Sequence, residues 1–244
     1  MLYIVRHGQT AQNLAQVLQG RSDYPLNEAG LRQAHEAARL LRSEGIFFDH
    51  VFSSPLIRAV QTAEILAPGR SPTLDNRLIE MDYGPYEGTD LNHLPQEILT
   101  FFSDFVHNPA PEGMEQLSSV VQRAGSFLDE VRNLPGNILI STHAIAMKGI
   151  LEYCTPESKG SYWSKYIGNC EVYTAENRGG QNRHSDAVHG CRLSFFPQHK
   201  CIKPGPSDRS SDVPGFSFPL FAQSEEDFSG LFPVIFTDFV QIRQ

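Results

Sequence analysis

The sequence predicts an α/β fold, a three-layer α/β/α sandwich built around a mainly parallel sheet. Three short apolar runs have the length of buried strands, and each is followed by polar residues and then by a segment with helical spacing. These runs are Leu2–Val5, Asp49–Ser53 and Asn137–Ser141. Because strands that alternate with helices tend to pair in parallel, we expect helices to cover both faces of the sheet.

The helices between these strands are predicted from apolar spacing and from the residues that begin and end helices. Asn27 is expected to cap the first long helix, and Gly45 is expected to end it. Ser54 and Pro55 are expected to begin the next helix, as its N-cap and its first helical residue. Two further helices are predicted from their apolar faces, over Leu117–Val131 and from Ala144 onward.

The composition places the chain among globular proteins. It has 244 residues, of which 40% are hydrophobic and 20% charged, and no stretch approaches 18 consecutive apolar residues, so membrane association is not expected. The formal net charge of −8 argues against binding to a nucleic acid backbone.

The N-terminal run MLYIV is too short for a signal peptide, and the four cysteines form no CxxC pair. Reduced thiols in a cytoplasmic protein are therefore expected.

The last part of the chain differs in character from the rest. Residues 178–244 hold nine of the sixteen phenylalanines, are rich in Ser, Pro and Gly, and keep no helical or alternating period. We therefore expect a domain over residues 1–177 and an atypical tail over residues 178–244. A docked lid, an added module and a non-native sequence are the alternatives for this tail. The abrupt change favours a reading-frame change near residues 176–182 as a hypothesis.

Polar residues gather where the predicted strands end. Arg6-His7-Gly8 follows the first strand, Ser53-Ser54-Pro55 with Arg58 follows the second, and Ser141-Thr142-His143 ends the third. Ligands of α/β proteins bind at the carboxyl ends of strands, so these groups are expected to converge on one site. Glu80 lies between them in the sequence, within the segment LIEMDYGPYEG.

These motifs resemble those of the histidine phosphatase (phosphoglycerate mutase-like) superfamily, and in particular its phosphatase branch. The matching segments follow one order: RHGQT at 6–10, GRSDYPLNEAG at 20–30, SSPLIRAVQTA at 53–63, the segment around Glu80, and STHAIA at 141–146. The resemblance covers residues 1–174. It implies a phosphoglycerate mutase-like fold with one more strand, expected over Asn169–Thr174, and hydrolysis of phosphate monoesters through a phosphohistidine.

The resemblance also implies a role for each site residue. His7 is the nucleophile that attacks phosphorus, and nearby guanidinium groups favour the neutral imidazole that it needs. His143 is a phosphate ligand that stabilises the transition state. Contacts to phosphate or substrate are implied for five residues: Arg6, Gly8, Asn13, Arg21 and Arg58. Because fixed cations neutralise the phosphoryl oxygens, no metal ion and no cofactor are expected.

Two assignments stay open at this stage. Glu80 is implied as the acid that protonates the leaving oxygen and later takes a proton from water, but Asp82, two residues away, is its rival. Arg21 either contacts substrate or caps a turn.

The expected substrate is a small phosphorylated metabolite, because the variable segment 85–116 has few basic residues to hold a highly anionic one. Two alternatives remain, a phosphoglycerate mutase-type phosphotransferase and a catalytically silent phosphoester-binding protein. The silent protein is supported by the atypical tail and by Ala144, which stands where the family usually has glycine.

Overall fold

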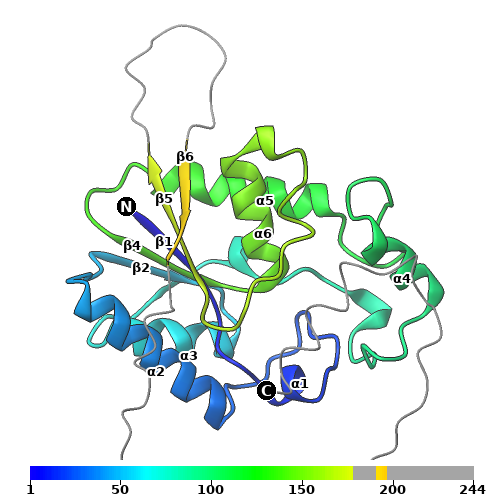
Figure 1. Cartoon of the computed structure of the whole chain (residues 1–244), viewed down its shortest axis with the longest axis horizontal. Helices are drawn as coiled ribbons and strands as arrows, with labels where there is room; N and C mark the ends of the chain where they lie inside the picture. The colour runs from blue at the N-terminus through cyan, green and yellow to red at the C-terminus, as the bar shows by residue number, and fades with distance from the viewer. Residues whose placement is uncertain (178–190, 197–244) are drawn as a thin grey trace, which may run out of the picture. The chain divides into compact units, whose positions relative to one another are not determined.

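The computed structural model describes residues 1–177 and 191–196, which form a six-stranded sheet with helices on both faces (Figure 1). The strands are β1 (Leu2–Arg6), β2 (His50–Ser53), β3 (Thr73–Leu74), β4 (Ile138–Thr142), β5 (Val172–Asn177) and β6 (Cys191–Phe195). Their order in the sheet is β3-β2-β4-β1-β5-β6. The first four strands pair in parallel, and β5 and β6 complete the sheet in antiparallel pairing. The mainly parallel sheet is therefore confirmed.

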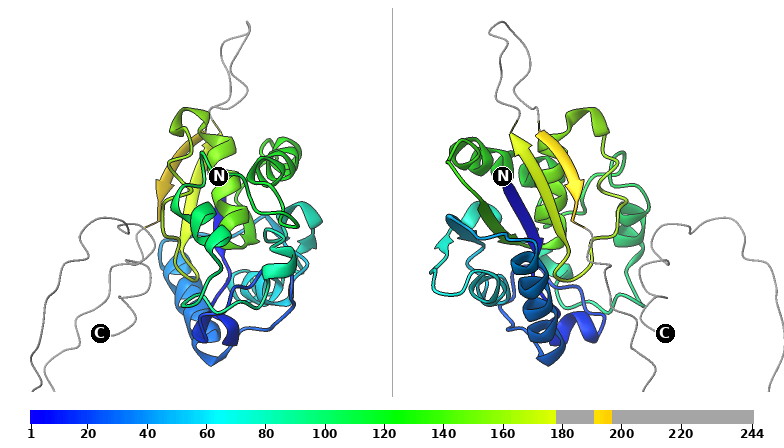
Figure 2. Two further views of the ribbon diagram at one scale, coloured as in Figure 1. Left: turned by 90° about the vertical axis from the view of Figure 1, so that its right-hand side faces the viewer. Right: turned by 60° about the vertical axis from the view of Figure 1, so that its left-hand side comes forward.

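The helices form the two outer layers of the sandwich. They are α1 (Ala11–Leu14), α2 (Glu28–Ser43), α3 (Ile57–Leu66), α4 (Gln96–Ser103), α5 (Leu117–Val131) and α6 (Ala144–Cys154). Three short 3₁₀ helices cover Asn76–Leu78, Gly84–Tyr86 and Pro156–Ser158. Helices α2 and α3 lie on one face of the sheet, and α5 and α6 lie on the other (Figures 1 and 2).

Alternate residues of β1 feed the two cores. Leu2 and Ile4 pack in the cluster under α5 and α6, while Tyr3 and Val5 pack in the cluster under α2 and α3. This alternation follows from the period of two in a strand, and it explains why a strand buried on both faces reads as a continuous apolar run. A third apolar cluster includes Met81 together with residues of α4, and it supports the segment that carries Glu80.

Several predicted boundaries agree with the structure. Asn27 caps α2, since its side chain accepts a hydrogen bond from the Gly30 N–H at 2.8 Å. Gly45, with φ of 72°, follows the end of α2, where the left-handed conformation costs glycine little. The predicted bounds Leu117–Val131 match α5, and α6 begins at Ala144 as expected.

The predicted start of the second helix is wrong. Helix α3 begins at Ile57, with Leu56 rather than Ser54 at its N-cap. The Ile57 N–H donates at 2.6 Å to the carboxylate of Asp23, which comes from a distant loop and serves as the cap. Ser54 and Pro55 remain in the turn that leaves β2.

The C-terminal strands differ in position from the expectation. The strand expected over Asn169–Thr174 is β5, which begins later, at Val172, and β6 lies beyond the boundary expected at residue 177. The rest of the predicted tail, residues 178–190 and 197–244, lies outside the described residues. Most of the interval 176–182, where a reading-frame change was hypothesised, lies outside them as well. Within the described part of the chain, no helix combines the length and apolar character needed to cross a membrane.

Candidate active site

The strand register brings the predicted histidines to one level of the sheet. Arg6 of β1 pairs with Thr142 of β4, so the next residues, His7 and His143, leave the sheet side by side. Their ring centroids are 5.1 Å apart. Both rings are buried, with 4% of His7 and 0% of His143 exposed. The parallel pairing of two strands far apart in the sequence therefore builds the centre of the site.

Arg58 reaches the same place from the first turn of α3. Its guanidinium is fully buried and donates to the carbonyls of Gly20 and Ser22, both at 2.7 Å, while its Nε donates to His7 Nε2 at 3.2 Å. Burial lowers the pKa of Arg58 to about 10, which leaves it charged at neutral pH. Among the described residues it forms no direct ion pair, and its contacts are the two carbonyls and His7, while the charges of Glu80, Asp23 and Glu87 act on it from a greater distance.

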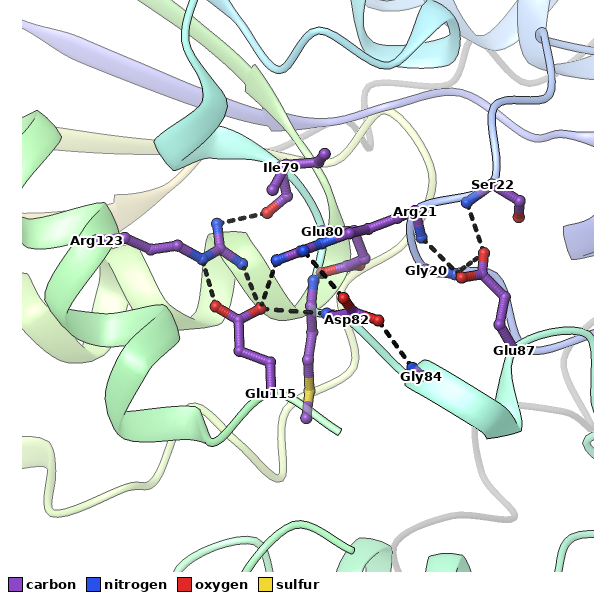
Figure 3. Close-up of polar contacts among 11 residues, drawn as sticks. Gly20, Arg21, Ser22, Ile79, Glu80, Asp82, Gly84, Glu87, Glu115 and Arg123 are labelled. Carbon is purple, nitrogen blue, oxygen red and sulfur yellow. Dashed lines mark hydrogen bonds and ion pairs between the residues drawn. The ribbon is translucent and has the colours of Figure 1, made fainter. Parts of the chain in front are cut away.

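The loop that carries these two carbonyls is itself anchored. The Glu87 carboxylate accepts hydrogen bonds from the backbone N–H groups of Gly20, Arg21 and Ser22 (Figure 3). With its N–H groups bound to Glu87, the loop presents the Gly20 and Ser22 carbonyls toward Arg58. The motif at residues 20–30 thus positions a guanidinium that lies about forty residues further along the chain.

His7 is held as a neutral base. Its Nδ1 lies 2.7 Å from the Gly8 carbonyl, which only accepts hydrogen bonds, so Nδ1 carries the proton and Nε2 carries a lone pair. Burial, followed by the charges of Arg58 and Arg6, holds the pKa of His7 well below its usual value. A neutral imidazole that carries its lone pair on Nε2 is the form that attacks an electrophile, and the attack exchanges the hydrogen bond from Arg58 for a bond to phosphorus.

Gly8 fits a close approach of two backbone segments. A side chain at this position would meet the carbonyl oxygen of Gly30 at 2.6 Å, and the Gly8 N–H donates to Thr62 Oγ1 at 3.1 Å. This packing fixes the turn that follows β1 and therefore the orientation of the His7 ring.

Three buried nitrogen atoms in this region have no hydrogen-bond partner among the described residues. They are Arg6 Nε, Gln19 Nε2 and His143 Nδ1. Unpaired buried donors are uncommon in folded proteins and ask for a specific explanation. A small oxyanion, which only accepts hydrogen bonds, is the kind of ligand that would satisfy them.

Asn13 and Gln19 form the edge of the site near α1. Asn13 closes a capping box with Thr10, and its Oδ1 accepts a hydrogen bond from Asn169, which also donates to the His7 carbonyl at 3.0 Å. Gln19 accepts a hydrogen bond from the Thr10 hydroxyl at 2.7 Å. The sequence interpretation missed Gln19 and Asn169. The sequence signal that could have found Gln19 is its position directly before the matching run that begins at Gly20.

Glu80 lies at the beginning of α6, directly beside His143. Its carboxylate is 4% exposed and accepts hydrogen bonds from the N–H groups of Ile145 at 3.2 Å and Ala146 at 3.0 Å. These are free donors of the first helical turn, where the helix dipole also favours a negative charge. The predicted acid is thus held next to the second histidine by the helix that this histidine caps.

Asp82 and Arg21 lie in a different environment. Arg21 bridges Asp82 at 2.9 Å and Glu115 at 3.4 Å, and Arg123 binds the other side of the Glu115 carboxylate at 2.7 Å and 3.1 Å (Figure 3). We refer to these four residues as the ion-pair network, and to Arg6, His7, Arg58 and His143 as the histidine cluster. Arg123 also donates to the carbonyls of Arg77 and Ile79, which fixes the segment directly before Glu80.

The structure therefore brings most of the predicted residues together. Four of them, Arg6, Gly8, Arg58 and Glu80, surround or adjoin the rings of the other two, His7 and His143. Asn13 joins them through Asn169, whereas the Arg21 side chain is 41% exposed and bound to carboxylates. Within residues 1–177 and 191–196, no three His, Cys, Asp or Glu side chains are grouped so as to hold a metal ion.

A pair of buried imidazoles flanked by guanidinium groups, with a carboxylate at the adjoining helix, is an arrangement suited to phosphoryl transfer. Comparison with known proteins agrees with this class. The sequence profile of the histidine phosphatase superfamily (branch 1) matches residues 2–187. The chain belongs to this superfamily and is an enzyme of the histidine phosphatase class.

Curated relatives and solved structures give the same result. The chain is 36% identical over 158 residues to a probable phosphoglycerate mutase GpmB of Yersinia pestis (strain Pestoides F), an alignment that covers 62% of this chain and 72% of the relative. Phosphoserine phosphatase of Entamoeba histolytica, solved with 3-phosphoglyceric acid, is similar with a TM-score of 0.67 and 25% identity, covering 80% of this chain and 96% of that one.

Two further solved structures share the fold. YhfR of Bacillus stearothermophilus has a TM-score of 0.68 at 28% identity, with 80% of this chain and 95% of that chain covered. Phosphoglycerate mutase of Thermus thermophilus has a TM-score of 0.60 at 26% identity, with 80% of this chain and 98% of that chain covered. The phosphoglycerate mutase-like fold is therefore shared with both phosphatases and mutases.

Proposed function

We propose that this chain hydrolyses a phosphate monoester of a small metabolite in the cytoplasm, through a phosphohistidine on His7 and without a metal ion. The observation that carries the proposal is the neutral His7, whose Nε2 lone pair faces Arg58. Among the described residues, Arg6 Nε, Gln19 Nε2 and His143 Nδ1 are buried without a hydrogen-bond partner, and such donors match the acceptor oxygens of a phosphoryl group. The cytoplasmic location is proposed from the sequence, in which the four cysteines form no CxxC pair.

The proposed reaction has two steps. In the first, His7 Nε2 forms a bond to phosphorus as the ester oxygen leaves, and Glu80 gives this oxygen a proton. In the second, water attacks the phosphohistidine and gives its proton to Glu80, which releases inorganic phosphate and restores neutral His7. Arg6, Arg58 and His143 stabilise the charge on the phosphoryl oxygens in both steps. Asn13 and Gln19 are proposed as further phosphate contacts.

Glu80 is proposed as the acid in preference to Asp82 because of their surroundings. Glu80 is buried beside His143, whereas Asp82 is 38% exposed and bound to Arg21. For Arg21 we propose a structural role, because both of its charged contacts are made to carboxylates of the chain itself.

Trapping the intermediate tests the proposal. The purified protein is mixed with a ³²P-labelled phosphomonoester in the presence of EDTA and quenched in base, in which phosphohistidine is stable. We expect label on the wild type and none on His7→Ala. His35→Ala is the matched control, because His35 is an exposed histidine on α2, and it should be labelled like the wild type. Label on His7→Ala, or loss of wild-type label in EDTA, would contradict the proposal.

A second candidate function is phosphoglycerate mutase-type phosphotransfer, which is favoured by the curated relatives at 36% identity. The two functions differ in what happens to the phosphohistidine, because a mutase returns the phosphoryl group to the substrate and a phosphatase gives it to water. Incubation with 3-phosphoglycerate separates them. Release of inorganic phosphate supports the phosphatase, and formation of 2-phosphoglycerate without phosphate release supports the mutase.

A further inference from the structure

Ser54 contacts His143 at the centre of the site, although the proposed reaction assigns Ser54 no role. Its Oγ lies 2.7 Å from His143 Nε2, and both side chains are fully buried. Ser54 directly follows β2, and β2 pairs with β4, so the strand register places the serine and the histidine next to each other. The contact is thus built into the sheet.

The direction of this hydrogen bond follows from counting donors and acceptors. The Leu56 N–H donates to Ser54 Oγ at 3.3 Å, so the serine oxygen already accepts one hydrogen bond. Its own hydroxyl proton needs an acceptor, and among the described residues the one within reach is His143 Nε2. In this direction Nε2 is the acceptor, and the proton of a neutral imidazole must then lie on Nδ1.

The protonation state of His143 agrees with this assignment. Burial, and then the charge of Arg58, hold the pKa of His143 well below its usual value, so the ring is neutral and has one N–H. Nδ1 is buried and has no partner among the described residues. A protonated Nδ1 is therefore a donor without a partner among the described residues, on a ring whose centroid lies 5.1 Å from that of His7.

We propose that Ser54 is a positioning residue that fixes His143 in the Nδ1–H tautomer and thereby provides a hydrogen-bond donor for the phosphoryl oxygens. This inference rests on the proposed function of the histidine cluster. Both His7 and His143 then carry their proton on Nδ1, but in His7 this leaves a lone pair for attack and in His143 it provides a hydrogen-bond donor. The Gly8 carbonyl holds the His7 proton so that a lone pair remains for attack, and the Ser54 hydroxyl occupies the His143 lone pair so that an N–H remains for binding.

The tautomer can be measured without any assay of activity. In the protein labelled with ¹⁵N-histidine, long-range ¹H–¹⁵N NMR spectra distinguish protonated from unprotonated ring nitrogens, and the His143 signals are assigned by their absence from His143→Gln. We expect Nδ1–H in the wild type, and a shift toward Nε2–H in Ser54→Ala. Ser53→Ala is the matched control, because it removes a buried hydroxyl that donates to the Ser54 carbonyl instead of the ring.

Kinetics with p-nitrophenyl phosphate provide the second measurement. Ser54→Ala is expected to lower kcat/KM about 10–100-fold, in line with the loss of one oriented donor, and Ser54→Thr is expected to recover most of it. A wild-type His143 protonated on Nε2, or an unchanged His143 tautomer in Ser54→Ala, would overturn the inference. The wild-type spectrum tests the predicted Nδ1–H tautomer even if the variant does not fold. Failure of the proposed function would instead appear as a wild type that forms no phosphohistidine.

Discussion

The histidine cluster and the ion-pair network balance their charges in opposite ways, although Glu80, which adjoins the first, and Asp82, which belongs to the second, are only two residues apart in the sequence. In the network, each guanidinium of Arg21 and Arg123 contacts a carboxylate. In the cluster, the hydrogen bonds of the buried Arg58 guanidinium within residues 1–177 and 191–196 go to carbonyl oxygens and His7. A paired charge stabilises the structure around it, whereas a buried charge without a counter-ion is costly and is expected where a ligand supplies the opposite charge.

The largest expected difference between the two regions is in anion binding. Arg58→Met should lower kcat/KM about 10³-fold, because a fixed donor to the phosphoryl oxygens is lost. Inorganic phosphate at about 100 times its Kd should raise the free energy of unfolding of the wild type by about 2.7 kcal/mol, and should fail to do so for Arg58→Met. Urea unfolding with and without phosphate measures this effect.

Arg123→Met is the matched control for Arg58→Met. It should lower the free energy of unfolding by about 1–3 kcal/mol, because the largely buried Glu115 carboxylate loses its two-point partner. The stabilisation by phosphate should remain in this variant. Equal phosphate stabilisation of both variants would refute the distinction between the two regions.

The next largest expected effect distinguishes Glu80 from Asp82 as the acid that protonates the leaving oxygen. Glu80→Gln should slow the formation of phosphoenzyme from an alkyl phosphate about 100-fold or more, because the alkoxide then leaves without a proton. With p-nitrophenyl phosphate the effect on this step should be much smaller, since nitrophenolate is a stable anion. Rapid-quench measurements on both substrates test this prediction. Asp82→Asn should change either rate only a few-fold, and a larger effect would assign the acid to Asp82.

The regions should also differ in their sensitivity to acid. His7 and His143 have depressed pKa values, so the unfolded chain binds protons below about pH 6.5 that the folded chain does not bind. Stability is thus complete above pH 6.5 and falls as the pH decreases from there. Between pH 7.5 and 5.5 each histidine should remove about 1.4 kcal/mol.

Carboxylates of the fold act in a lower pH window. Burial raises the pKa of Glu87, but hydrogen bonds from Ser22, Arg21 and Gly20 lower it by more, so its contribution is lost only below the pKa of an unfolded glutamate, about 4.3. Urea unfolding at pH 7.5 and 5.5 measures the effect of the histidines. His143→Gln should lose about half of the pH dependence, and a wild-type stability that is equal at both pH values would contradict this prediction.

The smallest expected effect is that of Arg21→Gln. The pair of Arg21 with Asp82 is exposed by 41% and 38%, and exposed pairs contribute about 0–1 kcal/mol. We therefore expect the free energy of unfolding to fall by no more than about 1 kcal/mol, with kcat/KM on p-nitrophenyl phosphate changed only a few-fold. A loss of activity comparable to that of Arg58→Met would show that Arg21 contacts the substrate.

Local sequence was enough to predict the elements whose cause is local. The apolar periods of α5 and the start of α6 depend on neighbouring residues, and so do the cap at Asn27 and the stop at Gly45. The order of strands and helices also sufficed to predict the parallel sheet and the convergence of its polar carboxyl ends.

The cap of α3 and the surroundings of the site residues depend on contacts between segments that are far apart in the sequence. They could therefore be seen only in the folded chain. Ser54 was predicted as a helix cap, but Asp23 takes that place and Ser54 binds His143 instead. The proposal of Glu80 rather than Asp82 as the acid likewise rests on burial and on partners from other elements, and the environments of Gln19 and Arg21 were set in the same way. Local sequence encodes propensity, whereas pKa values, tautomers and ion pairing follow from which groups the packed fold places together.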